Sequence, residues 1–389
     1  MGMVPPVHFR RGPDFMTRSA QPFFSRLLGR GKPAHATPEA AQAPLPARPP
    51  IPTAPIVSGP VPAIAAESAP GITFVTAVRN RTENLLQALP TWIERPEIDE
   101  IIIVDWHSDE PVAQSLADAG LTDPRIRIPR LVADEGWHSP SAFNMGLRLA
   151  RFDKVLKIDG DILIKDGFFE KHMPSPGRYI AGNFRIVEKH EIHINGTVFL
   201  HRSDLAKVGG INEFKVGYGW EDDDFYERLT RAGTAREDLD AKLVFHVPHG
   251  DETRVPPART ASARDQIMAR PAFDVRRNRY IMEFMPDWTG KRTLPAFQLK
   301  VAPDGSETVA RDGPDTSVVP PFVLARATDM CLRIYLSHRL GQDVLGLDEP
   351  FLAPLLDKPL AELGPDDVAA ALAAQEAAGG PAPSPTARM

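Results

Sequence analysis

The feature that most constrains this chain is an alternation of apolar strands and amphipathic helices between residues 72 and 161. The run Glu100–Val104 is apolar after its first residue, which is typical of a strand covered on both faces of a sheet. The expected strands are 72–78, 100–104, 126–128 and 154–158, and the expected helices are 82–93, 112–119 and 139–150. The alternation predicts an α/β fold with a mostly parallel central sheet and helices on both faces.

Three of the expected strands are followed directly by polar residues. Asn80, Asp105 and Asp159 each lie just beyond the carboxyl end of a different strand. In open α/β sheets, ligands bind beyond the carboxyl ends of the strands. The sequence therefore predicts a ligand site at this edge of the sheet.

The segment Asp159-Gly160-Asp161 places two carboxylates on a tight turn, where glycine permits a close approach by a ligand. Two carboxylates suit a hard divalent cation that also binds phosphates. The alternative for the isolated tripeptide is a solvated acidic turn. His246 and His249 follow a later strand, and histidines at this spacing can share a metal ion.

Four successive acids, Glu221–Asp224, begin an expected helix. Capping and the helix dipole explain one or two acids at such a position. Four should repel one another, so the pKa of at least one should rise, as a general base requires. The alternative is an acidic helix start on a solvated face. Gly217-Tyr218-Gly219-Trp220 precedes these acids, and its flanked aromatics predict a mobile loop that closes over a ligand.

Composition excludes several classes of protein. The single cysteine among 389 residues, Cys331, excludes a disulfide framework and a cysteine-only zinc site. The formal charge of −6 argues against a general nucleic-acid-binding protein. No apolar run approaches the roughly 20 residues of a membrane-spanning helix, so no such helix is expected.

Taken together, the motifs resemble those of GT-A-type glycosyltransferases, in particular the β-1,4-galactosyltransferases and the bacterial chondroitin-polymerase modules, which are similar to family 2. The resembling segments, in family order, are Val78-Arg79-Asn80-Arg81, Asn144-Met145-Gly146, Asp159-Gly160-Asp161, Asn195-Gly196-Thr197 and Gly219-Trp220 with Glu221–Asp224. The resemblance implies a GT-A fold and an inverting, metal-dependent enzyme. It would move a galactose-, GalNAc- or GlcNAc-like sugar from a UDP-sugar to a hydroxyl of a glycan or polysaccharide.

The resemblance also implies roles for individual residues. Asp222 is expected to be the general base. The residues expected to contact the acceptor or the sugar are Trp220, Glu221, Asp223 and Gly196. The residues expected to contact the nucleotide are Val78, Arg79, Asn80, Arg81, Asp105, Asn144 and Asp159. The expected ligands of Mn²⁺, or of Mg²⁺ in its place, are Asp161, His249 and His246.

Departures from the family pattern leave alternatives open. Tyr218 replaces the first tryptophan of the loop motif, and Trp106-His107 replaces the family's Asp-Gly. One alternative is a retaining GalNAc-type transferase, and another is a sugar-nucleotide-binding protein without catalysis. A nucleotidyltransferase has less support, because no glycine-rich phosphate loop is found near the N-terminus.

The expected organisation has four parts. Residues 1–70 form a disordered, basic, proline- and alanine-rich arm that is a solvated tail or contacts an anionic membrane surface. Residues 71–254 form the GT-A domain, 255–363 a helical extension without an assigned role, and 364–389 a disordered tail. The expected location is the cytoplasm, with peripheral contact at the inner face of the membrane.

Overall fold

The computed structural model describes residues 56–248, 262–285, 297–315 and 318–379. The chain divides into two compact units, Met1–Pro46 and Ala47–Met389, and all of the described residues belong to the second. The basic end of the expected arm therefore lies outside the described residues. None of the helices in the described ranges is long and apolar enough to span a membrane.

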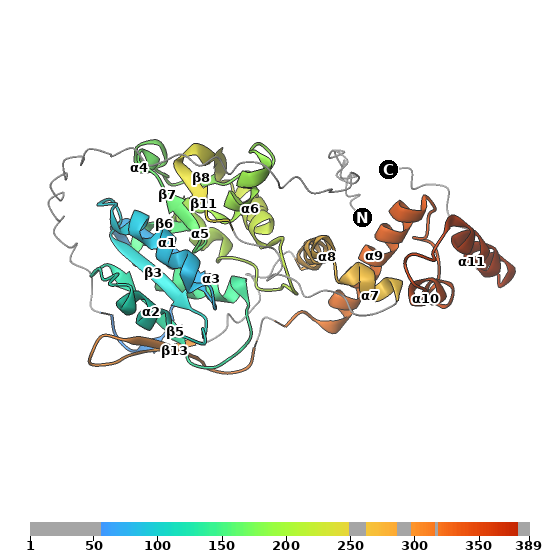
Figure 1. Ribbon diagram of the computed structural model, residues 1–389, viewed down its shortest axis with the longest axis horizontal. Helices are drawn as coiled ribbons and strands as arrows, with labels where there is room; N and C mark the ends of the chain where they lie inside the picture. Colours follow the sequence, from blue (N-terminus) through green and yellow to red (C-terminus); the bar gives the residue numbers. More distant parts are fainter. Residues whose placement is uncertain (1–55, 249–261, 286–296, 316–317, 380–389) are drawn as a thin grey trace, which may run out of the picture. The chain divides into compact units, whose positions relative to one another are not determined.

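A sheet of 11 strands forms the centre of the fold (Figure 1). Its strands are β1 (Gly59–Pro60), β2 (Ala69–Val78), β3 (Glu100–Asp105), β4 (Ile126–Arg127), β5 (Pro129–Leu131), β6 (Phe152–Lys157), β8 (Arg178–Ala181), β9 (Val198–His201), β10 (Ala235–Asp238), β12 (Phe297–Val301) and β13 (Glu307–Arg311). The order is β1-β12-β13-β5-β3-β2-β6-β9-β8-β10, and β4 pairs with β3. The strands β7 (Ile162–Ile164) and β11 (Val244–His246) form a separate antiparallel pair.

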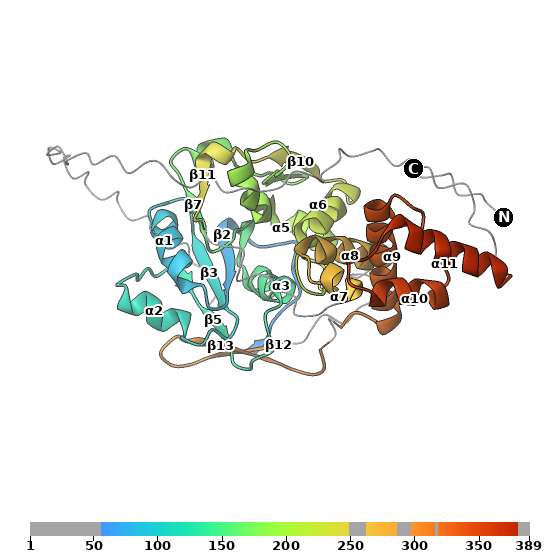
Figure 2. The same ribbon diagram turned by 45° about the vertical axis from the view of Figure 1, so that its right-hand side comes forward.

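The middle of the sheet is parallel, from β13 through β5, β3 and β2 to β6, while β9 is antiparallel to both of its neighbours. The predicted fold class, a mostly parallel GT-A-type α/β sheet, is confirmed. Helices α1 (Thr82–Ile93) and α2 (Val112–Asp118) lie on one side of β3, and α3 (Ser139–Leu149) lies on the other (Figure 2).

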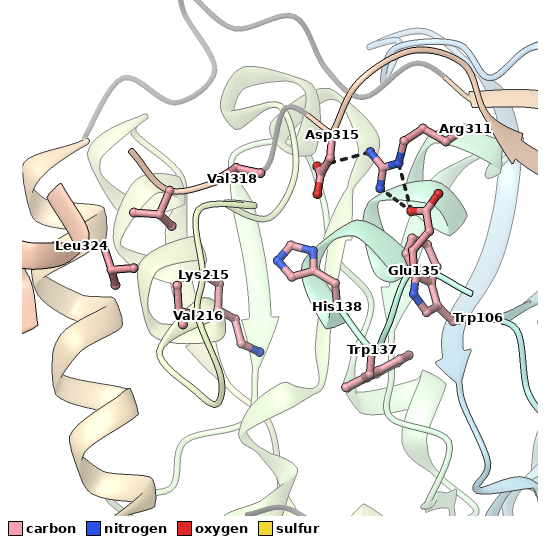
Figure 3. Close-up of a pocket in the computed structure, with 11 residues that line it drawn as sticks. Trp106, Glu135, Trp137, His138, Lys215, Val216, Arg311, Asp315, Val318 and Leu324 are labelled. Carbon is pink, nitrogen blue, oxygen red and sulfur yellow. Dashed lines mark hydrogen bonds and ion pairs between the residues drawn. The ribbon is translucent and has the colours of Figure 1, made fainter. Parts of the chain in front are cut away.

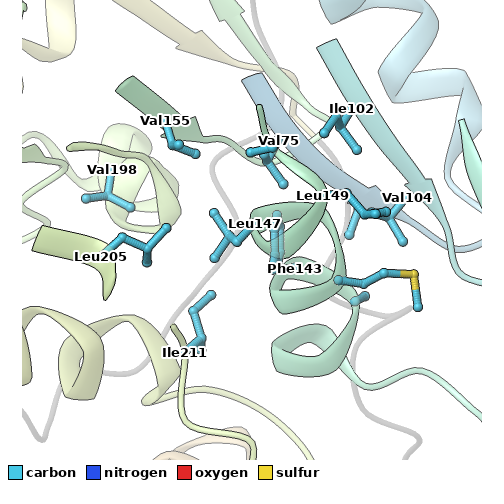
Figure 4. Packing of buried hydrophobic residues seen from close by; sticks show 14 of the residues in the cluster. Val75, Ile102, Val104, Phe143, Leu147, Leu149, Val155, Val198, Leu205 and Ile211 are labelled. Carbon is cyan, nitrogen blue, oxygen red and sulfur yellow. The ribbon is translucent and has the colours of Figure 1, made fainter. Parts of the chain in front are cut away.

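The strand residues alternate between two hydrophobic clusters, one on each face of the sheet. Ile101 and Ile103 of β3 pack in the cluster that contains α1, whereas Ile102 and Val104 pack in the cluster that contains α3. Figure 4 shows the second cluster, in which α3 lies against β2, β3 and β6. A Cβ on Gly146 of α3 would lie 2.5 Å from Val75 Cγ1, so this glycine is required for the close packing of helix on sheet.

The remaining helices follow in chain order. They are α4 (Phe168–Lys171), η1 (Lys189–Gly196), α5 (Arg202–Val208), α6 (Glu221–Arg231), η2 (Ala241–Leu243), α7 (Ala263–Met268), α8 (Pro271–Phe284), α9 (Pro321–Leu340), α10 (Glu349–Asp357) and α11 (Pro365–Ala377). The helices α7 to α11 share a hydrophobic cluster that includes Cys331, Leu336 and Leu355. The expected helical extension is thus present in the described C-terminal residues.

The expected domain boundaries differ from the structure at both ends of the GT-A domain. The strand β13 pairs with β5 in parallel, with Val309 opposite Leu131, so part of the C-terminal extension belongs to the central sheet. Arg127 secures this junction because its guanidinium donates to both carboxylate oxygens of Glu307 (2.8 and 2.9 Å) and to Glu100 (2.8 Å). At the other end, β1 pairs with β12, so the sheet begins inside the segment expected to be disordered.

The segment 364–389 is also more ordered than expected, because residues 365–377 form α11. Alanine has the highest intrinsic helix propensity, and this stretch contains no glycine and only its first residue is proline. Val368 is buried in the helical cluster. Gln375 accepts a hydrogen bond from Asp348 N (2.7 Å) and donates one to Gly346 O (2.9 Å). The composition of the whole tail concealed this local helix.

Candidate active site

The site forms where β6 ends beside the start of α6. The last residue of β6, Lys157, is buried, and its Nζ donates to Asp222 Oδ1 (2.8 Å) and to Gly196 O (2.8 Å). The same Nζ lies 3.6 Å from Asp159 Oδ1 and 4.3 Å from the centre of the Phe143 ring. One lysine therefore joins the two acidic motifs that the sequence analysis treated separately.

Lys157 was missed by the sequence analysis. The only feature of the sequence that marks Lys157 is its position. It is a charged residue within the otherwise apolar segment Val155–Ile158, two residues before Asp159. Burial lowers the pKa of Lys157, but the carboxylates of Asp222 and Asp159 outweigh burial and raise it above its usual value. Lys157 is therefore a fixed positive charge within the site.

Each of the four acids at the start of α6 has a different cation. The pairs are Glu221 with Lys215 (2.6 Å), Asp222 with Lys157 (2.8 Å), Asp223 with Arg185 (3.2 Å), and Asp224 with Arg228 (2.7 Å). The Asp224 pair lies within the helix at spacing i,i+4 and helps to hold it. The four consecutive acids are thus tolerated because separate parts of the fold neutralise them.

The prediction that one of these acids has a raised pKa is confirmed for Asp222. Burial raises the pKa of Asp222 to about 6, Glu221 and Asp159 add to the rise, and Lys157 opposes it. The main cause is therefore burial, whereas the sequence analysis expected mutual repulsion. Burial also raises the pKa of Asp159, with Asp161 adding to the rise. For Glu221, burial is outweighed by Lys215, which lowers its pKa to about 2.

Two of the three expected metal ligands lie together. Asp161 Oδ2 is 3.6 Å from His246 Nε2, because Asp161 precedes β7 and His246 ends β11, its antiparallel partner. Two ligands at about 2.1 Å from one ion lie about 3.0 to 3.4 Å apart, so the Asp161 carboxylate and the His246 imidazole would have to move slightly closer to share a cation. His249 lies outside the described residues. Within those residues, no three His, Cys, Asp or Glu side chains converge as a metal site.

Two of the residues expected to contact the nucleotide, Val78 and Asp105, are buried in the structure. Val78 packs in the core. Asp105 is fully buried and accepts from Ser108 N (2.8 Å) and Val112 N (3.1 Å), and it also pairs with Arg130. Its carboxylate closes the turn into α2, so a contact with uracil would require these bonds to break. The structure gives both residues supporting roles.

Asn144 has a similar supporting role in the structure. Its Nδ2 donates to Ile211 O (2.7 Å) and Glu213 Oε1 (2.8 Å), and its Oδ1 accepts from Ile211 N (2.8 Å). The side chain is 3% exposed, and these bonds fasten α3 to the segment after α5. Its expected nucleotide contact is therefore at odds with the observed geometry.

Three more residues expected to contact the nucleotide, Arg79, Asn80 and Arg81, follow β2 at the predicted edge of the sheet. Asn80 has a left-handed backbone (φ 55°) and exchanges hydrogen bonds with Asp109, through its Nδ2 (3.1 Å) and its Oδ1 (2.8 Å). This exchange ties the end of β2 to the end of β3. Arg79 pairs with the exposed Asp134 (2.8 Å), and Arg81 occupies the N-cap position of α1 without a side-chain capping bond.

Gly196 permits a close approach inside the site. A Cβ at this position would lie 2.4 Å from Asp159 Oδ2, and the Gly196 carbonyl accepts the bond from Lys157. A side chain here would displace Asp159. The close packing against Asp159 is a sufficient reason for glycine at this position, apart from the expected contact of Gly196 with sugar.

The loop 216–220, which the sequence predicts to be mobile, is hydrogen-bonded to α8 in this structure. Asn278 is fully buried, accepts from Val216 N (2.9 Å) and donates to Tyr218 O (3.2 Å) and Gly219 O (2.9 Å). A Cβ on Gly217 would lie 2.0 Å from Asp274 Oδ2, so the glycine lets the loop approach α8.

Trp220, the residue before α6, also contacts α8. Its backbone is left-handed (φ 74°), and the Arg279 guanidinium lies 5.2 Å from the centre of its ring. The expected extension thus helps to position the residue immediately before the acidic cluster.

Two family models match this chain. A model described as glycosyl transferase family 2 matches residues 73–178, and one described as the N-terminal domain of galactosyltransferase matches residues 180–250. No curated protein matches the chain. One similar solved structure is the catalytic domain of Drosophila β1,4-galactosyltransferase 7 in complex with xylobiose, at 16% identity and a TM-score of 0.39; the match covers 68% of this chain and 99% of that one. A mutant of the same enzyme with manganese, UDP-Gal and xylobiose has 14% identity and a TM-score of 0.37, with 68% and 99% covered.

The two family models divide the site between them. The first contains β2, β3 and β6 with Asp159 and Asp161, and the second contains Gly196, the acidic cluster and His246. These matches indicate a glycosyltransferase of GT-A type, similar to family 2 over residues 73–178 and to galactosyltransferases over residues 180–250. The resemblance noted from the sequence motifs is confirmed at this level.

Proposed function

We propose that the protein is an inverting glycosyltransferase that moves a galactose-, GalNAc- or GlcNAc-like sugar from a UDP-sugar to a glycan hydroxyl. The observation that carries this proposal is the Asp222–Lys157–Asp159 assembly. In it, Lys157 holds the partly exposed carboxylate of Asp222 beside the Asp159-Gly160-Asp161 turn. Asp222 is the general base. The acceptor side of the site is defined by Trp220, Glu221 and Asp223. The donor side is defined by Asp159, Asp161 and His246.

Asp222 is suited to accept the proton of the attacking hydroxyl. Lys157 holds Oδ1, and among the described residues Oδ2 has no hydrogen-bond partner, so that oxygen is available to the acceptor. With a pKa of about 6, the carboxylate is mostly ionised at neutral pH yet remains basic enough to take a proton. The side chain is 22% exposed, which is sufficient for contact with a ligand.

The donor side contains Asp159, Asp161 and His246. Asp161 and His246, with His249 as the further expected ligand, would hold Mn²⁺ or Mg²⁺. When bound, the ion supplies positive charge that neutralises the diphosphate leaving group. Lys157 adds a second positive charge on the same side, and it keeps Asp159 and Asp222 in place. Attack by the hydroxyl on the face opposite the diphosphate inverts the anomeric centre.

The test is a screen of UDP-sugars with Mn²⁺, with Mg²⁺ and with EDTA, in which both UDP release and transfer to acceptors are measured. UDP-Gal and xylobiose are the first donor and acceptor to try, since the solved structure named above contains them. We expect Asp222→Asn to lower kcat by about 10²- to 10⁴-fold, and Asp161→Ala to lower turnover and raise the concentration of Mn²⁺ that activity requires. Glu227→Gln is the matched control, because Glu227 lies on the same helix and pairs with Arg231 (2.8 Å) at the surface.

The outcomes separate the alternatives. Unchanged turnover in Asp222→Asn refutes the role of Asp222. Retention of the anomeric configuration in the product, read by NMR, favours the retaining GalNAc-type transferase. UDP binding without turnover over the whole acceptor panel favours the non-catalytic sugar-nucleotide-binding protein.

A further inference from the structure

A pocket of about 300 Å³ lies beside Lys215, the partner of Glu221 (Figure 3). Its lining comes from the residue after β3, from the segment that precedes α3, from the loop before α6, and from the stretch between the end of β13 and the start of α9. The lining residues are Trp106, Glu135, Trp137, His138, Lys215, Val216, Arg311, Asp315, Val318, Val319 and Leu324. The family models end at residue 250, so the last five of these lie outside them. This part of the pocket therefore belongs to the present chain's own C-terminal segment.

The charged groups of the lining neutralise one another. Arg311 donates to Glu135 Oε2 through both Nε (2.9 Å) and Nη2 (2.5 Å), and it also lies 3.4 Å from Asp315. Lys215 pairs with Glu221. Burial and the neighbouring Lys215 lower the pKa of His138 to about 4, so this imidazole is neutral at physiological pH. A phosphate or carboxylate ligand would find no uncommitted cation among these residues.

The same lining suits a neutral ring that carries hydroxyl groups. Trp137 exposes 48% of its surface and Val318 exposes 64%, and both offer apolar area to the C–H face of a sugar. The Arg311–Glu135 pair and His138 supply donors and acceptors to the same pocket, where Figure 3 shows the imidazole between Lys215 and Arg311. The volume is at the lower end of the range for small-molecule sites, about 300 to 1,000 Å³, which corresponds to a portion of a larger ligand.

The pocket connects to the acceptor side through Lys215. The Lys215 Nζ donates to Glu221 Oε1 (2.6 Å) and to Ser139 Oγ (2.7 Å), and Glu221 precedes Asp222. Glu221 Oε2 is buried and has no hydrogen-bond partner among the described residues. The expected ligands of the cation, Asp161 and His246, do not line the pocket. A ligand here would therefore lie close to Glu221, an expected acceptor contact, and would not touch the expected cation ligands.

We propose that this pocket is an acceptor subsite for an uncharged sugar residue, the neighbour of the residue whose hydroxyl is glycosylated. The inference rests on the proposed function and adds to it the class of acceptor, which is a neutral oligosaccharide of at least two residues. The donor could supply a similar ring, so the experiment measures the donor and the acceptor separately.

The test uses the full-length protein and an array of neutral and acidic oligosaccharides, onto which sugar is transferred from a labelled UDP-sugar. With a neutral oligosaccharide acceptor from the array, we expect Trp137→Ala to raise KM for the acceptor about tenfold. The KM for the donor and the rate of UDP-sugar hydrolysis by water should remain unchanged. Trp137→Phe should restore much of the acceptor affinity. Phe322→Ala is the matched control, since it removes an aromatic side chain that is 75% exposed and does not line the pocket.

The outcomes keep this inference distinct from the proposed function. An unchanged acceptor KM in Trp137→Ala overturns the subsite. A rise in donor KM alone overturns the acceptor assignment, and a preference for acidic oligosaccharides, or hydrolysis without transfer to any array member, overturns the assignment of a neutral sugar. The absence of turnover with every UDP-sugar refutes the proposed function instead. Labelled full-length protein that binds neutral oligosaccharides on the array, with loss of binding in Trp137→Ala, supports the subsite even without turnover.

Discussion

Replacing Lys157 with methionine should move the pH dependence of catalysis while leaving the shape of the side chain nearly unchanged. In the wild type, the pKa of Asp222 of about 6 predicts an acid limb of kcat/KM near pH 6. Lys157 is the main group that opposes a higher pKa, and its Nζ is 2.8 Å from Asp222 Oδ1. Without that charge, Asp222 and Asp159 both ionise less readily.

The magnitude follows from the effect of a close opposite charge, which lowers the pKa of a carboxyl by about 1 to 3 units. Loss of Lys157 should therefore raise the pKa of Asp222 by about 2 units, to about 8. The ionised fraction at pH 7 then falls from about 0.9 to about 0.1, so activity should fall about tenfold. At pH 9 the ionised fraction returns to about 0.9, and most of the loss due to titration should disappear.

The assay is kcat/KM for sugar transfer between pH 5 and 9, with circular dichroism to verify that each variant is folded. Lys215→Met is the matched control, because Lys215 is a second buried lysine whose carboxylate partner is Glu221. Its acid limb should stay closer to that of the wild type. A folded Lys157→Met protein whose acid limb remains near pH 6 would refute the reasoning.

Three further predictions concern the supports of the site and of the sheet. Asn278→Ala removes the bonds that hold Val216–Gly219 to α8. The KM for the acceptor should rise several-fold while the KM for the donor stays constant. Equal changes in both would contradict a role of Asn278 in positioning this loop for the acceptor. Arg127→Met leaves the buried carboxylate of Glu307 without its cation; urea denaturation should show a loss of about 3 to 5 kcal/mol, and a loss below 1 kcal/mol would argue against β13 as an integral strand. His138 has a folded pKa of about 4, below its unfolded value of 6.5, so stability is lost as pH falls from 6.5 to 4. His138→Gln should remove up to about 3 kcal/mol of that pH dependence. The free energy of unfolding is measured by urea denaturation at several pH values, and if it changes with pH as steeply in His138→Gln as in the wild type, the prediction is wrong.

Local sequence determined the parts of this protein that depend on short-range patterns. The apolar run at residues 100–104 and the alternating helices predict the parallel sheet because periodicity dictates which faces can be buried. The acids that follow β6 and begin α6 are recognisable for the same reason, since the chemistry of a turn or a helix start is local. The resemblance to glycosyltransferases rests on these segments.

The composition of a long segment does not reveal a short ordered element within it. The tail was expected to be disordered because alanine, proline and glycine dominate its final residues, yet Pro365–Ala377 lacks internal breakers and forms a helix. The strand β12, Phe297–Val301, alternates apolar and polar residues, but this local pattern does not show which sheet β12 and β13 join. Their place depends on pairing partners such as Leu131 and on the Arg127–Glu307 bonds.

The tertiary structure alone decided which polar residues face the site. Asp105 and Asn144 have the residue types and positions of ligand contacts, but backbone amides and carbonyls from elsewhere use their hydrogen-bonding groups. Lys157 resembles an ordinary lysine in the sequence, and it becomes central because folding buries it between Asp159 and Asp222. The physical reason is that the sequence specifies which groups can ionise or donate, whereas burial and long-range partners decide their pKa and what they are free to bind.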